Sequence, residues 1–598
     1  MKNEELRMSR NSKFFILLAF AFTMCASQPT KPHAPALTLD EKIGQLFVYA
    51  AHGVFTNEQS PLYKDLVHQV RDNRVGGIIW FVSDVYETAF LTSRLQREAK
   101  IPLLVSADLE MGVGMRFNDT TYWPTAMAVA ATGEPRLAEE MGRITAKEAK
   151  AIGVNHVLAP VADVNVDPDN PVINTRSFGE DPQDVARFVA AFVKGVQSEN
   201  VLATAKHFPG HGDTHVDSHR SLPVLNVTRE RLERVELIPF RAAIEAGVAS
   251  VMIGHLAVPS LDPTPAAVRE HSDATEDNPY GTHEGETETG GSVPATLSRP
   301  IVTDLLRREL KFDGLVVSDA MDMGGVVAHY DAGEAAVRAI EAGEDQILKS
   351  ADNDAAIAAV KAAVQSGRLT EARIDESVRR ILAAKARIST TAVSQDEIFR
   401  TLDSPEHSTV AKEIARRAVT LLREENGALP LAKDARVVIL TVSDFAELNN
   451  PLADFSKEVM ARLGRRPASF MLDSRSRIEE ATAVVEAAKR ADVVLLALAV
   501  RARSGAGHLA VPVAARAVVE QLPPNVKTIA VSFGSPYVIR DLPRVQTYFC
   551  AYGIQPVMQS AVAQAMFGEA PVTGHLPVTI PGLHKRGEGI QRSVNKER

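Results

Sequence analysis

Short, continuously apolar segments recur through the first part of the chain and alternate with segments of helical pattern. Between about residues 40 and 390 they read GQLFVYA, VGGIIWF, PLLVSAD, HVLAPVAD, LATAKHF, VASVMIGH, GLVVSDA and DQILKS. Continuous apolarity is typical of parallel strands, in which both faces are buried. Eight strand–helix units close a (β/α)8 barrel, and this TIM-type barrel is the fold we predict for residues 38–390.

The segments between these strands have the spacing of amphipathic helices. In EPRLAEEMGRITAKEAKAIG (134–153) and RIDESVRRILAAKARI (373–388), apolar residues recur every three or four positions, with charged residues opposite. Such helices serve as crossovers between parallel strands. Residues 262–293 interrupt the pattern, since they are rich in Asp, Glu, Thr, Gly and Pro and have little to bury. We expect an exposed insertion there.

A second alternation follows the predicted helix AKEIARRAVTLLREENGALPL. Its apolar segments are RVVILTVSD, PASFMLD, DVVLLALAV, TIAVSFGS, TYFCAY and the closing HLPVTIP. They predict an open α/β sheet of five or six strands and a domain boundary near residue 400. We therefore expect a linker and connecting helix at 391–425 and a C-terminal α/β sandwich domain at 426–598.

The first 30 residues have the pattern of a signal peptide. Four basic residues precede the apolar run FFILLAFAFTMC, which is too short to span a bilayer comfortably. We therefore expect export to the periplasm or envelope. Cys25 could carry a lipid that anchors the chain to a membrane, and ordinary cleavage nearby is the alternative. Cys550 is the only other cysteine, so we expect no disulfide in the mature chain.

Composition narrows the classes of partner. The chain is 45% hydrophobic and 24% charged, as in globular proteins, and its net charge is −9. No basic surface for a nucleic acid is expected from this balance.

Several polar residues end the predicted barrel strands, where α/β barrels build their active sites. They are Asp108, the pair Lys206 and His207, His255, and Asp319. We expect these titratable groups to converge on one rim of the barrel.

One of these strands continues into HFPGHGDTHVDSH, residues 207–219, with a histidine at every fourth position. A helix would stack the imidazoles as a metal site, but Pro209, Gly210 and Gly212 oppose a helix. We predict a loop over the barrel mouth and expect no metal or cofactor. A metal-dependent hydrolase remains the alternative, because His and Asp also bind metals from loops.

Within this loop the one-residue spacing of Asp217 and His219 lets a carboxylate orient an imidazole. Such a pair makes a proton donor. Asp319 supplies a separate carboxylate at a strand end. A carboxylate facing an acid/base group is the layout for two-step displacement at a sugar carbon.

These residues resemble glycoside hydrolase family 3, and within it the β-N-acetylglucosaminidase (β-N-acetylhexosaminidase) branch. The resemblance covers about residues 40–585. The most specific piece is KHFPGHGDTHVDSH, which matches the branch's loop throughout. Supporting pieces are RSFGEDP at 176–182, VVSDAMDM at 316–323, PATLS at 294–298, and HLPVTIP.

The resemblance implies a role for each site residue. Asp319 is implied to be the nucleophile that forms a covalent glycosyl-enzyme, His219 the acid/base and Asp217 its partner. The positions implied to hold the sugar hydroxyls are Asp108, Arg116, Arg176, Lys206 and His207.

The chain also departs from the family. Where D-Q-E-G-G-R-V-x-R is common, it has DLEMGVGMR, which keeps Asp108, Glu110, Gly112 and Arg116. Other branches donate a glutamate acid/base from the second domain, and the candidate loop 501–512 contains no acid. A histidine acid/base also leaves phosphate possible as an acceptor, because a neutral imidazole does not repel an anion as a carboxylate does.

We therefore expect an exported, retaining exo-glycosidase that removes terminal β-linked N-acetylglucosamine from peptidoglycan or chitin fragments. The alternatives are a β-glucosidase or another family 3 exo-glycosidase, a phosphorolytic enzyme, the metal-dependent hydrolase, and a catalytically silent sugar-binding protein.

Overall fold

The computed structural model describes residues 37–267, 291–388, 393–425, 427–502 and 509–594. The described residues from Leu39 onward form one compact unit. The predicted signal peptide with Cys25, and most of the predicted insertion at 262–293, lie outside the described residues. Among the described residues, no helix is both long and apolar enough to cross a membrane.

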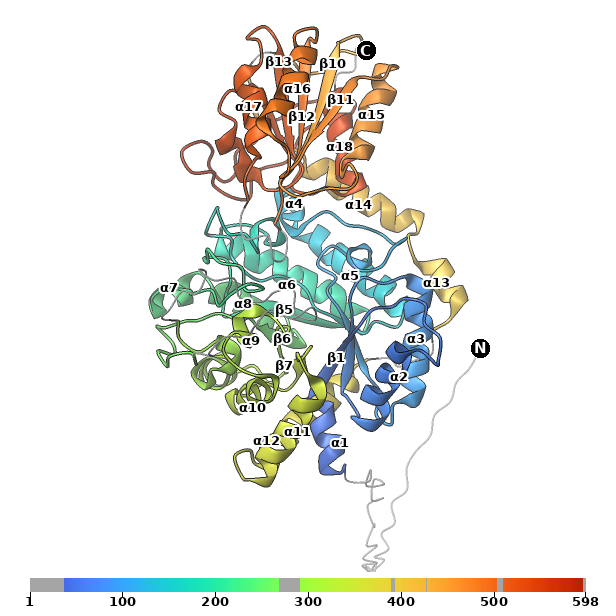
Figure 1. Ribbon diagram of the computed structural model, residues 1–598, viewed down its shortest axis with the longest axis vertical. Coiled ribbons are helices and arrows are strands. Elements are labelled where there is room, and N and C mark those ends of the chain that lie inside the picture. The colour runs from blue at the N-terminus through green and yellow to red at the C-terminus, as the bar shows by residue number, and fades with distance from the viewer. Residues whose placement is uncertain (1–36, 268–290, 389–392, 426, 503–508, 595–598) are drawn as a thin grey trace, which may run out of the picture. The chain divides into compact units, whose positions relative to one another are not determined.

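Eight parallel strands form the first sheet, one from each apolar segment (Figure 1). Neighbours pair in the order β7-β6-β5-β4-β3-β2-β1-β8, and a parallel bridge between Val317 and Gln346 brings the two ends together. The predicted barrel is confirmed. Its strands are β1 (Phe47–Ala51), β2 (Gly77–Trp80), β3 (Leu104–Ala107), β4 (His156–Val157), β5 (Leu202–Phe208), β6 (Ser250–Ile253), β7 (Leu315–Ser318) and β8 (Ile347–Leu348).

Helices surround the strands of the barrel, and the two helices predicted at 134–153 and 373–388 are confirmed as α5 and α12. Several of the helices begin at a side-chain cap; Asp181, for example, accepts the first amides of α6. The helices are α1 (Leu39–Gln45), α2 (Pro61–Val67), α3 (Val85–Glu98), α4 (Ala126–Ala131), α5 (Pro135–Ala151), α6 (Pro182–Ser198), α7 (Arg229–Arg234), α8 (Leu237–Glu245), the π-helical Pro300–Glu309, α9 (Gly324–Val327), α10 (Ala332–Ala342), α11 (Asn353–Gln365) and α12 (Glu371–Lys385).

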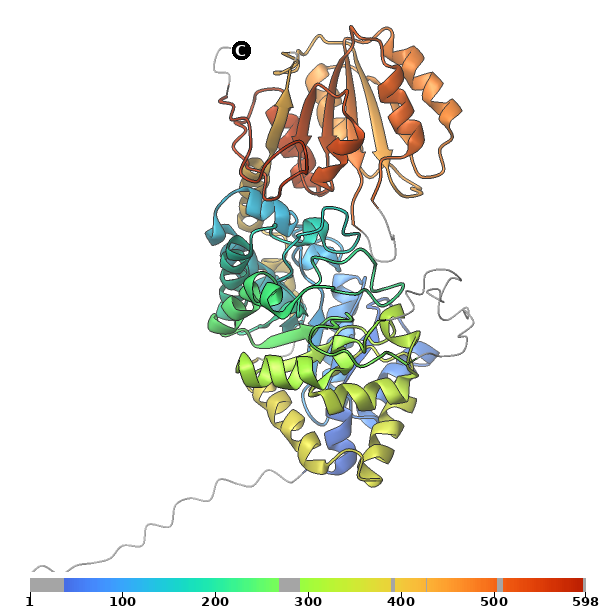
Figure 2. The same cartoon turned by 90° about the vertical axis from the view of Figure 1, so that its left-hand side faces the viewer.

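A second sheet has the order β11-β10-β12-β13-β14-β9 and is parallel except for β9. Figure 2 shows the strands of this sheet with helices beside them. Helices α15 and α18 pack together, as do α16 and α17. The elements are α13 (Gln395–Thr401), α14 (Pro405–Ala418), β9 (Thr420–Glu424), β10 (Val437–Ser443), α15 (Ala453–Leu463), β11 (Ala468–Leu472), α16 (Ala481–Ala488), β12 (Val493–Ala499), α17 (Val513–Gln521), β13 (Lys527–Ser532), β14 (Thr547–Cys550) and α18 (Pro556–Met566).

Two predictions for this second part were wrong. The connecting helix ends at Ala418, and Thr420–Glu424 is an antiparallel edge strand whose Leu421 pairs with Phe549. Pairing with β14 overrides the local helical pattern. HLPVTIP is no strand of the sheet, because prolines 577 and 581 lack the N–H that a ladder needs, and only Ile580 forms an isolated bridge.

The core of the second sheet also takes in side chains from the barrel sequence. Met127, Ala128 and Ala131 of α4 are fully buried and belong to the same apolar cluster as strands β10, β12 and β13. The two sheets therefore share buried apolar contacts.

Candidate active site

The polar residues that end the apolar segments lie at the carboxyl ends of the barrel strands. Asp108 directly follows β3, and Asp319 directly follows β7. Lys206 and His207 lie near the end of β5, whose last residue is Phe208, and His255 follows β6. Their placement on one rim is as predicted, since this is the end at which α/β barrels collect functional groups.

Four of the predicted sugar-binding residues share one ion-pair network. Asp108 accepts Lys206 Nζ at 2.7 Å on one oxygen and Arg116 Nη2 at 2.7 Å on the other. Glu110 binds Arg176 through two hydrogen bonds of 2.9 and 2.8 Å and lies 2.8 Å from Lys206 Nζ. Glu110 therefore joins Lys206 to Arg176.

The network keeps its carboxylates charged. Burial alone would raise the pKa of Asp108, but Lys206 and Arg116 lower it overall. The pKa of Glu110 is likewise held well below its usual range, because Arg176 and Lys206 outweigh the effect of burial. Fixed charges of both signs thus face the barrel mouth, an arrangement suited to binding hydroxyl groups.

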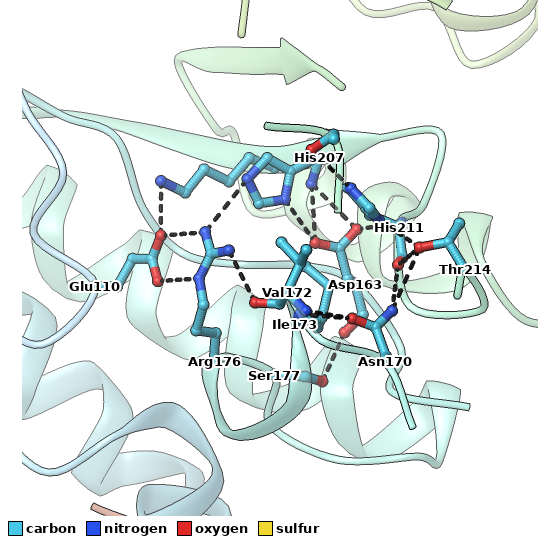
Figure 3. Close-up of polar contacts among 12 residues, drawn as sticks. Glu110, Asp163, Asn170, Val172, Ile173, Arg176, Ser177, His207, His211 and Thr214 are labelled. Carbon is cyan, nitrogen blue, oxygen red and sulfur yellow. Dashed lines mark hydrogen bonds and ion pairs between the residues drawn. The ribbon is translucent and has the colours of Figure 1, made fainter. Parts of the chain in front are cut away.

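His207 is held by a buried carboxylate at the end of the HVLAPVAD segment. Its Nδ1 lies 2.7 Å from Asp163 Oδ2, and its Nε2 lies 3.5 Å from Arg176 Nη2 (Figure 3). Burial would raise the pKa of Asp163, but His207 and His211 lower it overall. Asp163 is therefore an anion beside an imidazole.

His211 braces the loop from inside. Its Nδ1 is 2.7 Å from Thr214 Oγ1 and its Nε2 is 3.1 Å from Ser218 Oγ, while Asn170 donates to its carbonyl oxygen. Burial lowers the pKa of His211 to about 4, so this imidazole is neutral near pH 7. The segment from 209 to 219 contains no helix, as predicted from its glycines and proline.

Asp217 and His219 form the predicted carboxylate–imidazole pair. Asp217 Oδ1 accepts the backbone N–H of His219 at 2.9 Å and lies 2.8 Å from its Nδ1. The Asp217 side chain is fully buried, and that of His219 is 25% exposed. Because Nδ1 faces the carboxylate, Nε2 is the nitrogen left to exchange a proton with a bound molecule.

The loop is fastened to the segment that carries Asp319. Gly324 N–H donates to the carbonyl oxygen of His219 at 3.3 Å, and Gly325 N–H donates to that of Ser218 at 3.1 Å. A Cβ on Gly324 would lie 2.9 Å from the carbonyl oxygen of His219, so the close approach requires glycine. Two backbone hydrogen bonds thus bring the imidazole segment to the segment after β7.

Asp319 is half-buried and fixed by its surroundings. Its Oδ1 accepts the N–H of Ala320 at 2.8 Å. Burial would raise its pKa, but the field of His207, His255 and His219 lowers it overall. His255, buried between Thr296 and the carbonyl oxygen of Ala320, holds this corner of the rim. Asp319 is therefore available as an anion.

The four histidines of the loop do not converge on one point. His207 pairs with Asp163, His211 with Thr214 and Ser218, His215 with Asp167, and His219 with Asp217. Within the described part of the chain, no group of three or more His, Cys, Asp or Glu side chains has the geometry of a metal site.

The structure adds three residues to the site that the sequence-based set does not contain. Asp163 ends an apolar segment exactly as Asp108 does, so the strand-end rule could have identified it. Glu110 stands in a matched motif, and its partners were visible only in three dimensions. His255 is predicted at a strand end, but the sequence assigns it no role. Most of loop 501–512, namely 503–508, lies outside the described residues.

Comparison with known proteins agrees with this geometry. The Glycosyl hydrolase family 3 N terminal domain matches residues 38–384, and the family's C-terminal domain matches 419–595. A β-N-acetylglucosaminidase/β-glucosidase of Cellulomonas fimi is 31% identical over 554 residues, which are 90% of this chain and 93% of that protein.

Solved structures give the same family. A glycoside hydrolase family 3 β-N-acetylglucosaminidase from Paenibacillus sp. str. FPU-7 superposes with a TM-score of 0.77 at 33% identity, covering 91% of this chain and 99% of that one. The β-glucoside phosphorylase BglX, bound to 2FGlc, superposes with a TM-score of 0.78 at 25% identity. The match covers 91% of this chain and 95% of that one. With both domains matched, the barrel closed and the loop folded beside the strand-end carboxylate, this chain belongs to glycoside hydrolase family 3.

Proposed function

We propose that the protein is a retaining exo-glycosidase that removes terminal β-linked N-acetylglucosamine through a covalent intermediate. Asp319 attacks the anomeric carbon, and the bond from that carbon to the leaving oxygen breaks. His219 Nε2 gives its proton to the departing oxygen and then takes a proton from the water that releases the sugar. Asp217 holds the imidazole and stabilises its charged form.

The observation that carries this proposal is the pairing of His219 with buried Asp217 on a loop fastened beside Asp319. A proton donor and a carboxylate are then supplied from two different strand ends, as two-step displacement requires. A silent sugar-binding protein would have no need of this pair.

The sugar is held by the charged network next to these groups. Asp108, Arg116, Lys206, Arg176 and His207 supply donors and acceptors for the hydroxyls of one terminal residue. The Paenibacillus protein is named as a β-N-acetylglucosaminidase alone, which supports N-acetylglucosamine over glucose. Peptidoglycan and chitin fragments are the proposed sources of such ends.

A panel of aryl β-glycosides tests the substrate. We expect turnover of the N-acetylglucosaminide to exceed that of the glucoside by at least about tenfold. The Cellulomonas relative is named for both activities, so a preference for the glucoside would turn the assignment to β-glucosidase. An inert, folded protein would favour the sugar-binding alternative.

Phosphorolysis is the second candidate, favoured by a histidine rather than a carboxylate in the acid/base position. The BglX structure is that of a phosphorylase. Phosphate would attack the anomeric carbon, and the bond to Asp319 would break to give a sugar 1-phosphate. We expect water to be the acceptor. If phosphate accelerates turnover and sugar 1-phosphate forms, phosphorolysis replaces hydrolysis.

We further propose that residues 1–30 direct export to the envelope and that the enzyme serves peptidoglycan turnover there. The basic residues and the apolar run in the sequence support export. The mass of the mature N-terminus distinguishes a lipid on Cys25 from ordinary cleavage.

A further inference from the structure

Asp163 occupies the centre of the loop's hydrogen-bond network, although no reaction step uses it. Its side chain is fully buried, and both oxygens accept hydrogen bonds. It accepts the backbone N–H of His207 at 3.2 and 3.3 Å and that of His211 at 2.7 Å, and it lies 2.7 Å from His207 Nδ1 (Figure 3). An anion with these neighbours dictates where their protons lie.

The two groups that flank the His207 ring select one tautomer. An ionised carboxylate can only accept, so Nδ1 must carry the proton that faces Asp163. On the other side, the guanidinium of Arg176 can only donate, and it lies 3.5 Å from Nε2. Nε2 is therefore an acceptor in the neutral ring.

We propose that Asp163 is a positioning residue that fixes the Nδ1–H tautomer of His207 and so keeps Nε2 unprotonated, so that a hydroxyl of the bound sugar can replace the long 3.5 Å contact with Arg176 and donate to Nε2. This rests on the proposed function, in which His207 binds the terminal sugar. Asp163 touches neither substrate nor reacting atoms and acts through the imidazole.

An amide in place of the carboxylate removes this control. Asparagine has one acceptor oxygen for three N–H groups, and its NH2 donates. Where the NH2 of the new asparagine faces Nδ1, the ring proton has to move to Nε2, which then points a donor at Arg176 and no longer accepts from the sugar. The loss of one such hydrogen bond to the substrate should lower kcat/KM about 10- to 100-fold.

The chain offers a matched control in Asp167. Its side chain is also buried, on the same stretch that follows β4, and it lies 2.7 Å from Nδ1 of another loop histidine, His215. The His215 side chain is 79% exposed and takes no part in the proposed reaction. Asp167→Asn therefore changes a comparable pair without touching the sugar site.

Steady-state kinetics on folded variants give the first test. Asp163→Asn should lower kcat/KM about 10- to 100-fold, equally for an aryl N-acetylglucosaminide and for a disaccharide, because the defect concerns the sugar common to both. Asp167→Asn should stay within about threefold of the wild type. A kcat/KM for Asp163→Asn within threefold of the wild type contradicts the proposal.

A double-mutant cycle asks whether Asp163 acts through His207. In a His207→Gln background, Asp163→Asn should lower kcat/KM by no more than about threefold, since the ring it orients is gone. The full 10- to 100-fold loss in that background would mean that Asp163 acts by holding the loop at His211, and the proposal would fail.

The wild-type protein provides a test that needs no folded Asp163 variant. In protein with 15N-labelled histidine, the His207 signals, assigned by their disappearance in His207→Gln, should show a protonated Nδ1 and an unprotonated Nε2 at neutral pH. The opposite tautomer overturns the proposal. A wild type without glycosidase activity would instead defeat the proposed function, and this spectrum would still decide the tautomer.

Discussion

The histidine spacing of residues 207–219 is that of a metal-binding helix, yet each imidazole has its own partner. His219 is paired with Asp217 and His207 with Asp163, so the two rings belong to separate ion pairs. A loop gives each ring a separate direction, so spacing along the sequence does not become proximity in space. In this loop the partners of the imidazoles determine which ring nitrogen carries a proton.

We predict that activity needs no divalent metal, because each histidine of the loop already contacts a partner of its own. Exhaustive chelation followed by assay of the aryl N-acetylglucosaminide should leave kcat/KM unchanged within about twofold. Loss of activity that zinc or manganese restores would instead support a metal-dependent hydrolase.

A second residue-scale prediction concerns Lys385, which is buried on α12 and donates to Gln45 Oε1 at 2.5 Å. Burial lowers its pKa to about 7, below its ordinary value of about 10.4. Between these values the unfolded chain holds a proton that the folded chain lacks, so Lys385 makes stability rise with pH from about 7 to 10.

Lys385→Met should abolish that contribution. The Tm of the wild type should therefore rise relative to that of the variant as the pH increases from 7 to 9.5, with the loss of the Gln45 hydrogen bond displacing the variant curve equally at each pH. Curves that run parallel over this range would mean that Lys385 does not titrate there.

Because α/β barrels collect functional groups at the carboxyl ends of their strands, the sequence predicts which residues lie on one rim. It does not predict which of them form ion pairs or hydrogen bonds with one another. Asp108 and Lys206 could be placed on one rim because parallel strands end together. That Glu110 bridges Lys206 and Arg176 depends on side-chain reach between separate loops, which no local pattern encodes. The position of Asp163 at the end of an apolar segment could have been used to predict that it belongs to the site. Its contact with His207 could be learned only from the structure.

At the scale of elements, the site depends on how the loop after β5 meets the segment after β7. Gly324 permits the contact, since a side chain there would collide with the carbonyl oxygens of Arg220 and His219. Backbone contacts at Gly324 and Gly325 therefore determine where the His219 segment lies relative to the segment of Asp319.

Gly324→Ala should displace the His219 segment and lower kcat/KM at least about tenfold, with a larger loss for a disaccharide than for an aryl glycoside, because protonation of the leaving group suffers. Gly291→Ala is the matched control, since its nearest neighbour would be at an ordinary 3.6 Å. If both variants keep wild-type activity, the backbone contact does not position His219.

Elements with strong periodicity were predicted well, and those defined by their neighbours were not. The eight barrel strands and helix α5 follow from apolar runs and helical spacing. Strand β9 does not, because its sequence continues a helical pattern and only pairing with β14 makes it extended. HLPVTIP has the apolar pattern of a strand, but its prolines lack the N–H groups that a sheet ladder needs.

At the scale of the whole molecule, the barrel and the second sheet are joined by shared burial. Met127 of α4 is fully buried in the core of the second sheet. Polar contacts add to this junction: Thr579 donates to Glu180 at 2.6 Å through both its N–H and its hydroxyl. We expect the two parts to unfold together.

Met127→Ala should lower the free energy of unfolding by about 2–5 kcal/mol, the usual effect of emptying a buried methionine site. In a Cys25→Ser protein, tryptophan fluorescence reports the barrel through Trp80 and Trp123, and the reactivity of buried Cys550 reports the second sheet. Both urea transitions should shift equally. A shift of the Cys550 transition alone would mean that the parts unfold independently.

The division of labour between Asp319 and His219 is tested most directly by glycosylation rates on two substrates, a disaccharide and an activated aryl glycoside. General-acid catalysis raises the rate about 10²- to 10⁴-fold, and it matters most for a poor leaving group such as a sugar. His219→Ala should therefore lose far more on the disaccharide, Asp217→Ala should show the same pattern more mildly, and Asp319→Asn should fail on both. Equal losses on both substrates for His219→Ala, or near-normal turnover by Asp319→Asn, would contradict the mechanism.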